Sequence, residues 1–189
     1  VLESRDAQGH LQLRSYGRDG QLKHASVKLA NAGSTKTLVS DIRYNALGAV
    51  EQETAGNGVI STALYDEGNG RLLRLRAQSA ERTFQDLSYT YDPVGNVMSI
   101  EDAVQSTGHF SQQRTDPVNR YRYDSLYQLI EATGREVATF SHGPRLPSFQ
   151  TLPVDAGCLV NYTQRFDYDP GGNLIARHHS GTDTCRMAT

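Results

Sequence analysis

The sequence contains six copies of one short motif, in which a tyrosine is followed by turn-forming residues and then by an aliphatic residue. The aliphatic residue stands six places after the tyrosine in five copies and seven places after it in the third. The motif tyrosines are Tyr16, Tyr44, Tyr65, Tyr91, Tyr123 and Tyr168. Such repetition is typical of arrays, in which each unit buries its apolar face against its neighbours. The repeat therefore predicts a function that depends on the array and not on one compact active site.

Each copy predicts a β-hairpin. Leu87, Tyr89 and Tyr91 alternate with polar residues, which is the period of a half-buried strand. Tyrosine is favoured there because its ring packs on the sheet while its hydroxyl reaches water. The next residues are typical of a turn, with Asp and Pro at its start and glycine where φ is positive. The expected turn residues are Asp92, Asp124, Asp169, Gly20, Gly48, Gly70, Gly95 and Gly172. The aliphatic residue then begins the return strand, so the predicted fold class is all-β, built from antiparallel hairpins.

Two turns need separate treatment. In the fifth copy Tyr127 stands where the other copies have glycine. Because a bulky residue rarely adopts positive φ, that turn must either avoid positive φ or accept strain, and we expect a looser turn. A further hairpin is predicted between the second and third copies, around Ala55-Gly-Asn-Gly58, where Asn57 and Gly58 suit a primed two-residue turn.

The spacing of the copies predicts one repeat segment over residues 1–189. The longest interval, between the last two motif tyrosines, contains three of the six prolines and predicts an insertion at about residues 134–157. The polar residues 180–189 predict a frayed tail. The first residues, Val-Leu-Glu-Ser, resemble neither an initiator methionine nor a signal peptide, so we expect an excised part of a longer polypeptide.

Composition favours a thin sheet with one face in water, because only 37% of the residues are hydrophobic and tryptophan is absent. The net charge of −2, with both signs interspersed, gives no electrostatic reason to expect a nucleic-acid partner. No apolar run approaches 18 residues, so we expect no direct membrane insertion.

Candidate catalytic and metal-binding groups are few. Asp92-Pro93 and Asp169-Pro170 could form a carboxylate dyad, but both aspartates stand where a hairpin turn begins, and we interpret them as turn residues. His178-His179 could bind a metal, yet adjacent strand residues point to opposite faces, so surface positions are expected. We therefore predict no catalytic residue, no metal and no cofactor.

Two questions remain open from the residues alone. Cys158 and Cys185 could pair, but two cysteines in irregular segments do not define a disulfide framework. The tyrosine rows could bind sugars by stacking, which would make the chain a carbohydrate-binding module at a cell surface. Packing between neighbouring strands is the interpretation we favour, because cross-strand aromatic pairs hold an array together.

Three stretches carry a family resemblance: Tyr89–Val97, Tyr121–Arg135 and Tyr168–Leu174. They resemble the YD repeat of bacterial Rhs and teneurin-type proteins. With Asn161-Tyr-Thr they also resemble the C component (TccC-like) of insecticidal toxin complexes. The similarity is dense from about Gly56 to Ile175 and thinner before it.

The resemblance implies a structural role. In that family the C component joins a B component to form a hollow shell of spiralling β-strands. The shell holds the toxin's own variable C-terminal effector domain, which is released by self-cleavage and delivered through the A-component channel. This chain would then be a length of shell wall, secreted or released from bacteria as part of a toxin complex.

The same resemblance implies the partners. They are a B-component-like subunit, the C-terminal effector as cargo and, indirectly, the A-component channel. No stretch here resembles the family's self-cleaving region, so the resemblance implies no enzymatic residue. A wall segment in isolation exposes strand edges, and we expect it to associate with itself or to depend on a partner.

Overall fold

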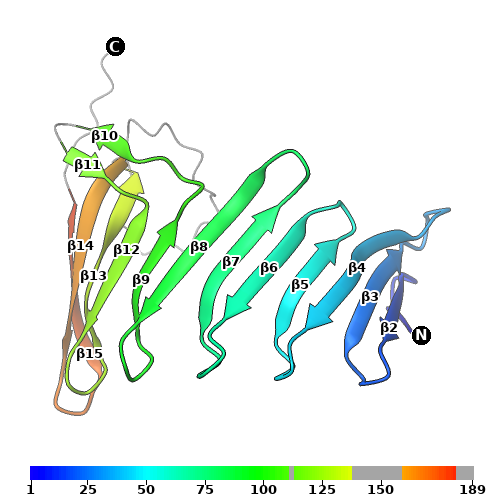
Figure 1. Cartoon of the computed structure of the whole chain (residues 1–189), viewed down its shortest axis with the longest axis horizontal. Coiled ribbons are helices and arrows are strands. Elements are labelled where there is room, and N and C mark those ends of the chain that lie inside the picture. Colours follow the sequence, from blue (N-terminus) through cyan, green and yellow to red (C-terminus); the bar gives the residue numbers. More distant parts are fainter. Residues whose placement is uncertain (111–112, 138–158, 182–189) are drawn as a thin grey trace. The chain divides into compact units, whose positions relative to one another are not determined.

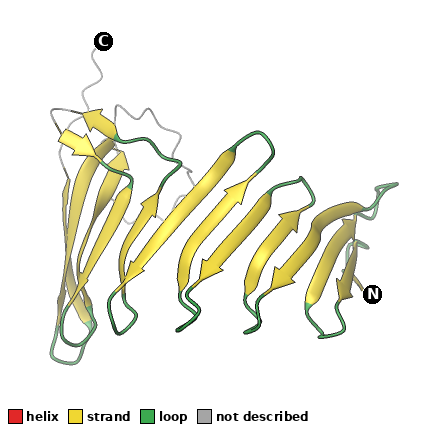
Figure 2. Ribbon diagram, viewed as in Figure 1, coloured by secondary structure: helices red, strands yellow, loops and turns green. Residues whose placement is uncertain are grey.

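The computed structural model describes residues 1–110, 113–137 and 159–181, and within these ranges the chain is all-β (Figure 1, Figure 2). The strands are β1 (Leu2–Arg5), β2 (Leu11–Tyr16), β3 (Leu22–Lys28), β4 (Lys36–Tyr44), β5 (Val50–Ala55), β6 (Ile60–Tyr65), β7 (Leu72–Gln78), β8 (Thr83–Tyr91), β9 (Val97–Asp102), β10 (Gly108–Phe110), β11 (Gln113–Thr115), β12 (Val118–Tyr123), β13 (Leu129–Val137), β14 (Leu159–Tyr168) and β15 (Leu174–Gly181). Every motif tyrosine is the last residue of a strand.

Strand order follows chain order. In the described residues a thirteen-stranded sheet runs from β1 to β9 and then from β12 to β15, while β10 and β11 pair separately. The registers are antiparallel, which confirms the predicted fold class. The chain divides into two compact units, residues 1–87 and 88–189, and β8 begins in the first and ends in the second.

The first unit is a meander of hairpins with little core. Its described buried positions are Ile42, Ser26 and Asp86. Arg74 binds the Asp86 carboxylate through Nε and Nη2, each at 2.6 Å, and these hydrogen bonds lower the pKa of that carboxyl against the opposing effect of burial. Arg74 of β7 thus makes a bidentate contact with the buried carboxylate of Asp86 in β8.

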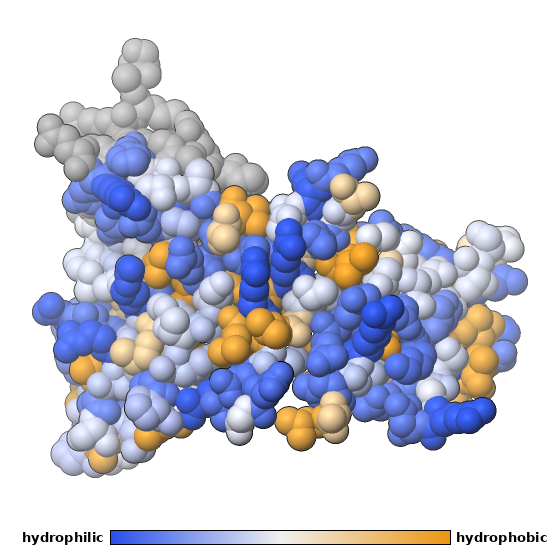
Figure 3. Space-filling view, viewed as in Figure 1, coloured by the Kyte–Doolittle hydropathy of each residue, from blue (hydrophilic) through white to orange (hydrophobic). Residues whose placement is uncertain are grey.

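The second unit separates its side chains onto two faces. In β8, β12 and β14 the motif tyrosines and the residues two places before them are half-buried, while the residues between them are exposed. On the other face Glu131 of β13 pairs with Arg122 of β12 at 3.2 Å and with Arg165 of β14 at 3.4 Å. On the face of the molecule seen in Figure 3, small apolar patches lie scattered among polar residues.

Two expected boundaries need correction. β13 continues to Val137, so the first four residues of the insertion expected from residue 134 belong to the sheet, and the rest of it lies outside the described residues. β15 continues to Gly181, so the expected tail at 180–189 begins inside a strand and is otherwise outside the description. In the described part of the chain no helix is long and apolar enough to cross a membrane.

Candidate functional site

Five of the six motif turns share one hydrogen-bonding scheme, and the third, between Asp66 and Arg71, is one residue longer. In the turn between β8 and β9 the backbone NH of Gly95 donates to Asp92 O at 3.2 Å, and the NH of Asp92 donates to Asn96 O at 3.0 Å. Gly95 has φ of 111°, which glycine adopts without strain. This is a three-residue hairpin loop, a tight turn followed by a residue in the left-handed region. The same backbone bonds close the turns that begin at Gly17, Asn45, Asp124 and Asp169.

The turn aspartates are occupied inside their own turns. The Asp92 carboxylate accepts hydrogen bonds from the backbone NH of Gly95 and Asn96 at 2.7 and 2.8 Å and from the Asn96 side chain at 2.8 Å. Burial alone would raise the pKa of this carboxyl, but the hydrogen bonds lower it below its usual value. The Asn173 side chain and backbone lower the pKa of Asp169 in the same way. The two aspartates lie in different turns, so they form no dyad.

The glycines of the five motif turns that have one at this position all have positive φ: Gly20, Gly48, Gly70, Gly95 and Gly172. Tyr127 takes the same conformation, with φ of 62°. Its NH donates to Asp124 O, and the Asp124 NH donates to Gln128 O, as in the glycine turns. The expectation of a looser turn is therefore wrong. The repeat geometry is kept, and the backbone of Tyr127 accepts the strain of the left-handed region.

The hairpin between β5 and β6 also differs from expectation. The NH of Gly58 donates to Ala55 O and the NH of Ala55 donates to Val59 O, so the loop is the three-residue type. Gly58 has φ of 84°, whereas Asn57 is not among the residues with positive φ, which excludes the primed two-residue turn. Gly56 lies against the backbone carbonyl of Thr37 and donates to Leu38 O at 2.8 Å. A side chain at that glycine would displace β4.

The repeats are connected by a series of tyrosine hydroxyls, which we call the tyrosine ladder. Each ladder hydroxyl donates to the backbone carbonyl of the aliphatic residue that begins the return strand of the preceding copy. The bonds are Tyr44 to Leu22 at 2.8 Å, Tyr65 to Val50 at 3.1 Å, Tyr123 to Val97 at 3.1 Å and Tyr168 to Leu129 at 2.9 Å. Four of the six motif hydroxyls thus have a partner within the sheet, which the expectation that they reach water did not include.

The two remaining motif tyrosines differ in exposure. Tyr16, in β2, is 42% exposed, whereas Tyr91 is half-buried. No pattern in a single copy reveals the ladder, because donor and acceptor belong to different copies. The sequence feature that could have indicated the ladder is the fixed interval from tyrosine to aliphatic residue. It places the tyrosine hydroxyl and the acceptor carbonyl at the same end of every hairpin.

A row of tyrosines lies on the second unit. Burial raises the pKa of Tyr89, Tyr121 and Tyr162, and proximity to Tyr121 raises it further at Tyr89 and Tyr162. The alternate strands β8, β12 and β14 thus contribute aromatic side chains to one half-buried row.

The histidine pair is divided between two faces, as expected for adjacent strand residues. His178 is exposed and lies 2.9 Å from Asp167. His179 is not a surface residue as expected: it lies 2.8 Å from Glu136, 3.2 Å from Gln164 and stacks on Tyr162 with 5.8 Å between ring centroids. Among the described residues no group of three metal-ligating side chains gathers, and Cys158 and Cys185 lie outside them.

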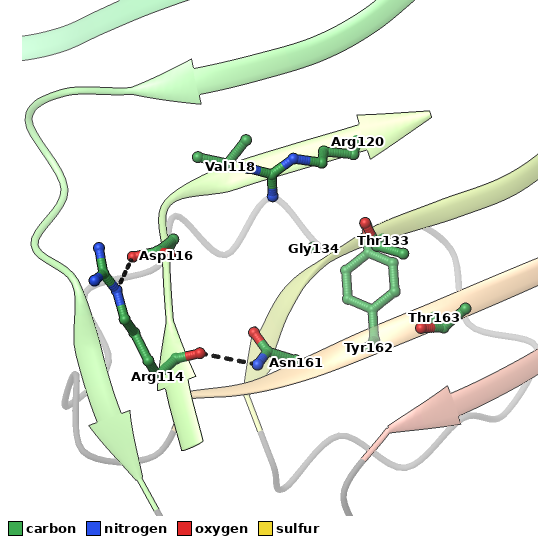
Figure 4. Close-up of a pocket in the computed structure, with 9 residues that line it drawn as sticks. All are labelled: Arg114, Asp116, Val118, Arg120, Thr133, Gly134, Asn161, Tyr162 and Thr163. Atoms are coloured by element: carbon green, nitrogen blue, oxygen red, sulfur yellow. Dashed lines mark hydrogen bonds and ion pairs between the residues drawn. The ribbon is translucent and has the colours of Figure 1, made fainter. Parts of the chain in front are cut away.

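One pocket of about 240 Å³ lies in the second unit, lined from β11 to β14 (Figure 4). Arg114 Nε binds Asp116 at 2.7 Å, and the Arg114 carbonyl accepts the Asn161 side-chain NH at 3.0 Å. The hydrogen bond from Arg114 lowers the pKa of Asp116, although burial alone would raise it. Thr107 and the charge of Arg120 lower the pKa further. The pocket is polar, and its charged residues Arg114 and Asp116 pair with each other. Its side chains present no nucleophile beside a base.

The sequence was compared with known proteins. No protein-family model matches the sequence. Toxin subunit YenC2 of Yersinia entomophaga is 38% identical over 192 residues, covering 97% of this chain and 20% of the relative. Toxin subunit YenC1 of the same organism is 38% identical over 187 residues, covering 95% and 19%.

Solved structures agree. The Photorhabdus luminescens Tc holotoxin pore contains a chain that matches 95% of this one with a TM-score of 0.83 and 38% identity, over 8% of its own length. A TcdB2–TccC3 crystal structure matches 95% with a TM-score of 0.83 and 38% identity, over 9% of its length. The chain belongs to the TccC-like, Rhs/YD-repeat family of Tc toxin C components.

This TccC-like chain spans about a fifth of the length of the curated relatives it matches. Its fold is that of a Tc toxin shell component, and the resemblance read from the three motif stretches is confirmed. The tyrosine ladder and the turn aspartates are thus features of a repeat sheet that resembles part of these larger toxin subunits.

Proposed function

We propose that the chain is a wall segment of a hollow YD-repeat shell, which encloses a C-terminal toxin effector domain before its delivery. The observation that carries the proposal is the tyrosine ladder. It links successive hairpins through a side-chain hydrogen bond in addition to the strand pairing. A sheet so linked is continuous along the array, which is what a wall requires.

The packing supports the same role. Only Ile42, Ala132, Leu159 and Val160 are buried hydrophobic residues in the described chain. A sheet with so little core does not resemble a compact enzyme domain, and its stability rests on contacts between adjacent strands. Closing such a sheet into a shell removes strand edges and excludes proteases and water from the interior.

The partners follow from the family. We propose a B-component-like subunit as the second part of the shell and the polypeptide's own C-terminal effector as cargo. The A-component channel would act later, in delivery, and the complex would be released from the bacterium. Away from these partners the segment associates with itself through its edges.

Neither alternative gains support from the described residues. Sugar stacking needs exposed aromatic faces, and five of the six motif tyrosines are half-buried. Self-cleavage would need a catalytic group, and the candidate aspartates Asp92 and Asp169 are hydrogen-bonded within ordinary turns. We propose that this segment is structural and not enzymatic.

The test is protease protection of the C-terminal domain in the full-length parent, assembled with its B-like partner. Wild type is compared with a variant in which Tyr123 and Tyr168 are changed to phenylalanine, which removes two ladder hydroxyls and keeps the rings. The expected result is a protected C-terminal domain in wild type and faster cleavage of that domain in the variant.

Tyr127→Phe is the matched control, because Tyr127 is 60% exposed and lies outside the ladder. Protection should be as strong in this control as in wild type. If the C-terminal domain of the assembled wild type is digested as fast as a free domain, the encapsulation proposal is wrong.

A further inference from the structure

The strand β15 lies at one edge of the described sheet, and its first residue stands where four other copies have the acceptor of a ladder bond. Leu174 is the aliphatic residue of the sixth copy, equivalent to Leu22, Val50, Val97 and Leu129. Each of those four carbonyls accepts a tyrosine hydroxyl from the next copy. No tyrosine of a described strand is placed to donate to Leu174, because β14 is its only neighbour in the sheet.

The side chains at the start of β15 are also unusually exposed. Leu174 is 54% exposed and the adjacent Ile175 is 66% exposed. The equivalent Val50, which is next to a ladder tyrosine, is 36% exposed, and Leu22, Val97 and Leu129 are half-buried. The start of β15 therefore lacks the cover that the next copy gives elsewhere.

Three of the four ladder junctions share one register. At the fourth, continuing the pairing of β3 with β4 places Leu22 opposite Ile42, two residues before Tyr44. At the other three, continuing the observed strand pairing places the aliphatic residue opposite the residue immediately before the donor tyrosine. The pairs so obtained are Val50 with Leu64, Val97 with Arg122 and Leu129 with Asp167, and Tyr65, Tyr123 and Tyr168 follow directly. The same offset at three junctions defines where a strand must lie for its tyrosine to reach the carbonyl.

We propose that the β15 edge is a docking surface for a strand of the YD-repeat type that is not among the described strands. It pairs antiparallel with β15, and the residue before its tyrosine lies opposite Leu174. Its tyrosine hydroxyl donates to the Leu174 carbonyl, and its ring covers Leu174. This rests on the proposed function, and it adds the chemistry and the register by which the wall accepts its next strand.

The ladder distinguishes this occupant from a second copy of the chain. The other edge of the described sheet is β1, with the sequence Leu2-Glu3-Ser4-Arg5 and no tyrosine. The tyrosine of β2, Tyr16, is separated from that edge by β1 itself. Head-to-tail stacking of two copies would thus pair strands without completing the ladder, so a tyrosine-bearing strand is favoured at β15.

The experiment uses the whole 189-residue chain and a synthetic probe. The probe is a hairpin peptide with the sequence of residues 118–135, closed by a disulfide between cysteines added at its ends. In the chain this segment carries Tyr123, which donates to Val97 across the β9 junction. Binding is measured by amide hydrogen exchange of residues 174–181, titrated with peptide.

Two altered peptides separate the ladder from plain strand pairing. Tyr123→Phe removes the donor hydroxyl, and Tyr127→Phe removes a hydroxyl at the turn. One hydrogen bond of this kind predicts roughly 2- to 10-fold weaker binding for the Tyr123→Phe peptide. The Tyr127→Phe peptide should bind as the parent does. Peptide NMR confirms that all three hairpins are equally folded.

Three results would overturn the proposal. They are equal affinity of the Tyr123→Phe and parent peptides, protection at β1 in place of β15, and no protection by any peptide at about millimolar concentration. The outcome is independent of the protease-protection test, which uses the assembled parent. Encapsulation with no peptide effect would mean that the wall closes by another register.

Discussion

The hydroxyl of Tyr168 donates a hydrogen bond to the carbonyl oxygen of Leu129 at 2.9 Å, from the end of β14 to the start of β13. The donor belongs to the sixth copy of the motif and the acceptor to the fifth. Because the interval between the two copies is the longest in the chain, this bond shows that the ladder does not depend on the length of the connecting segment. It depends on where the strands end.

Removal of one ladder hydroxyl should weaken the sheet measurably. Tyr168→Phe keeps the ring and leaves the Leu129 carbonyl without this donor, so we expect a loss of about 1 kcal/mol in the free energy of unfolding. Chemical denaturation measures it. Tyr127→Phe is the control and should change stability by less than about 0.5 kcal/mol. Equal losses in both variants would remove the ladder as a source of stability.

Replacing Tyr127 by glycine should stabilise the chain. The residue has φ of 62° and is 60% exposed, so glycine relieves backbone strain and gives up little buried area. The greater freedom of glycine in the unfolded chain offsets part of the gain, which leaves a net increase of up to about 1 kcal/mol. Thermal unfolding of Tyr127→Gly tests this. Tyr127→Ala, which keeps the strain, should show no increase.

Gly56 and Gly58 should respond differently to the same change. A Cβ at Gly56 would overlap the backbone carbonyl of Thr37, whereas a Cβ at Gly58 would meet no atom within 4 Å. We expect Gly56→Ala to cost more than about 2 kcal/mol, because β4 must move. Gly58→Ala should cost about 1 kcal/mol from its φ of 84° alone. Urea unfolding of the two variants gives the comparison, and similar losses would contradict the close approach to β4.

The contact between Arg74 and Asp86 predicts acid sensitivity. Hydrogen bonds from Arg74 lower the pKa of the Asp86 carboxyl below its ordinary 3.8. The stabilisation is therefore present in full above the unfolded-state pKa and is lost as pH falls through the folded-state pKa. The stability difference between wild type and Asp86→Asn should be large at pH 7 and shrink as the pH falls below about 4.

Asp41→Asn is the control for that titration. The Asp41 side chain is 49% exposed and its carboxylate lies 3.5 Å from Arg43, so its replacement should cost little at any pH. Denaturant unfolding at a series of pH values gives both curves. A difference for Asp86→Asn that stays constant down to pH 3 would show that the ionised carboxylate contributes nothing to the fold.

The hairpins could be predicted because each is specified by adjacent residues. Proline, aspartate and glycine fix the turn, and alternation before Tyr91 or Tyr123 fixes the strand. Tyr127 was misjudged because hydrogen bonds from the whole turn outweigh the preference of one residue. The primed turn at Asn57 was misjudged because Gly56 is held against β4, a constraint from another hairpin.

The contacts between copies could not be read from one copy. The tyrosine ladder joins residues that are 15 to 39 positions apart, and the acceptors are backbone atoms with no signature of their own. His179 was placed at the surface because its partner Glu136 lies 43 residues away. In each case register across a neighbouring strand decides the contact.

The choice of a main-chain oxygen as the ladder's acceptor bears on how such proteins change in evolution. Every amino acid supplies a carbonyl, so the residue that receives the tyrosine can vary freely among Leu22, Val50, Val97 and Leu129 and their counterparts elsewhere. A copy can therefore be duplicated, deleted or exchanged with one from another protein without a matching mutation in its neighbour. The length of the array can drift while every junction stays chemically the same.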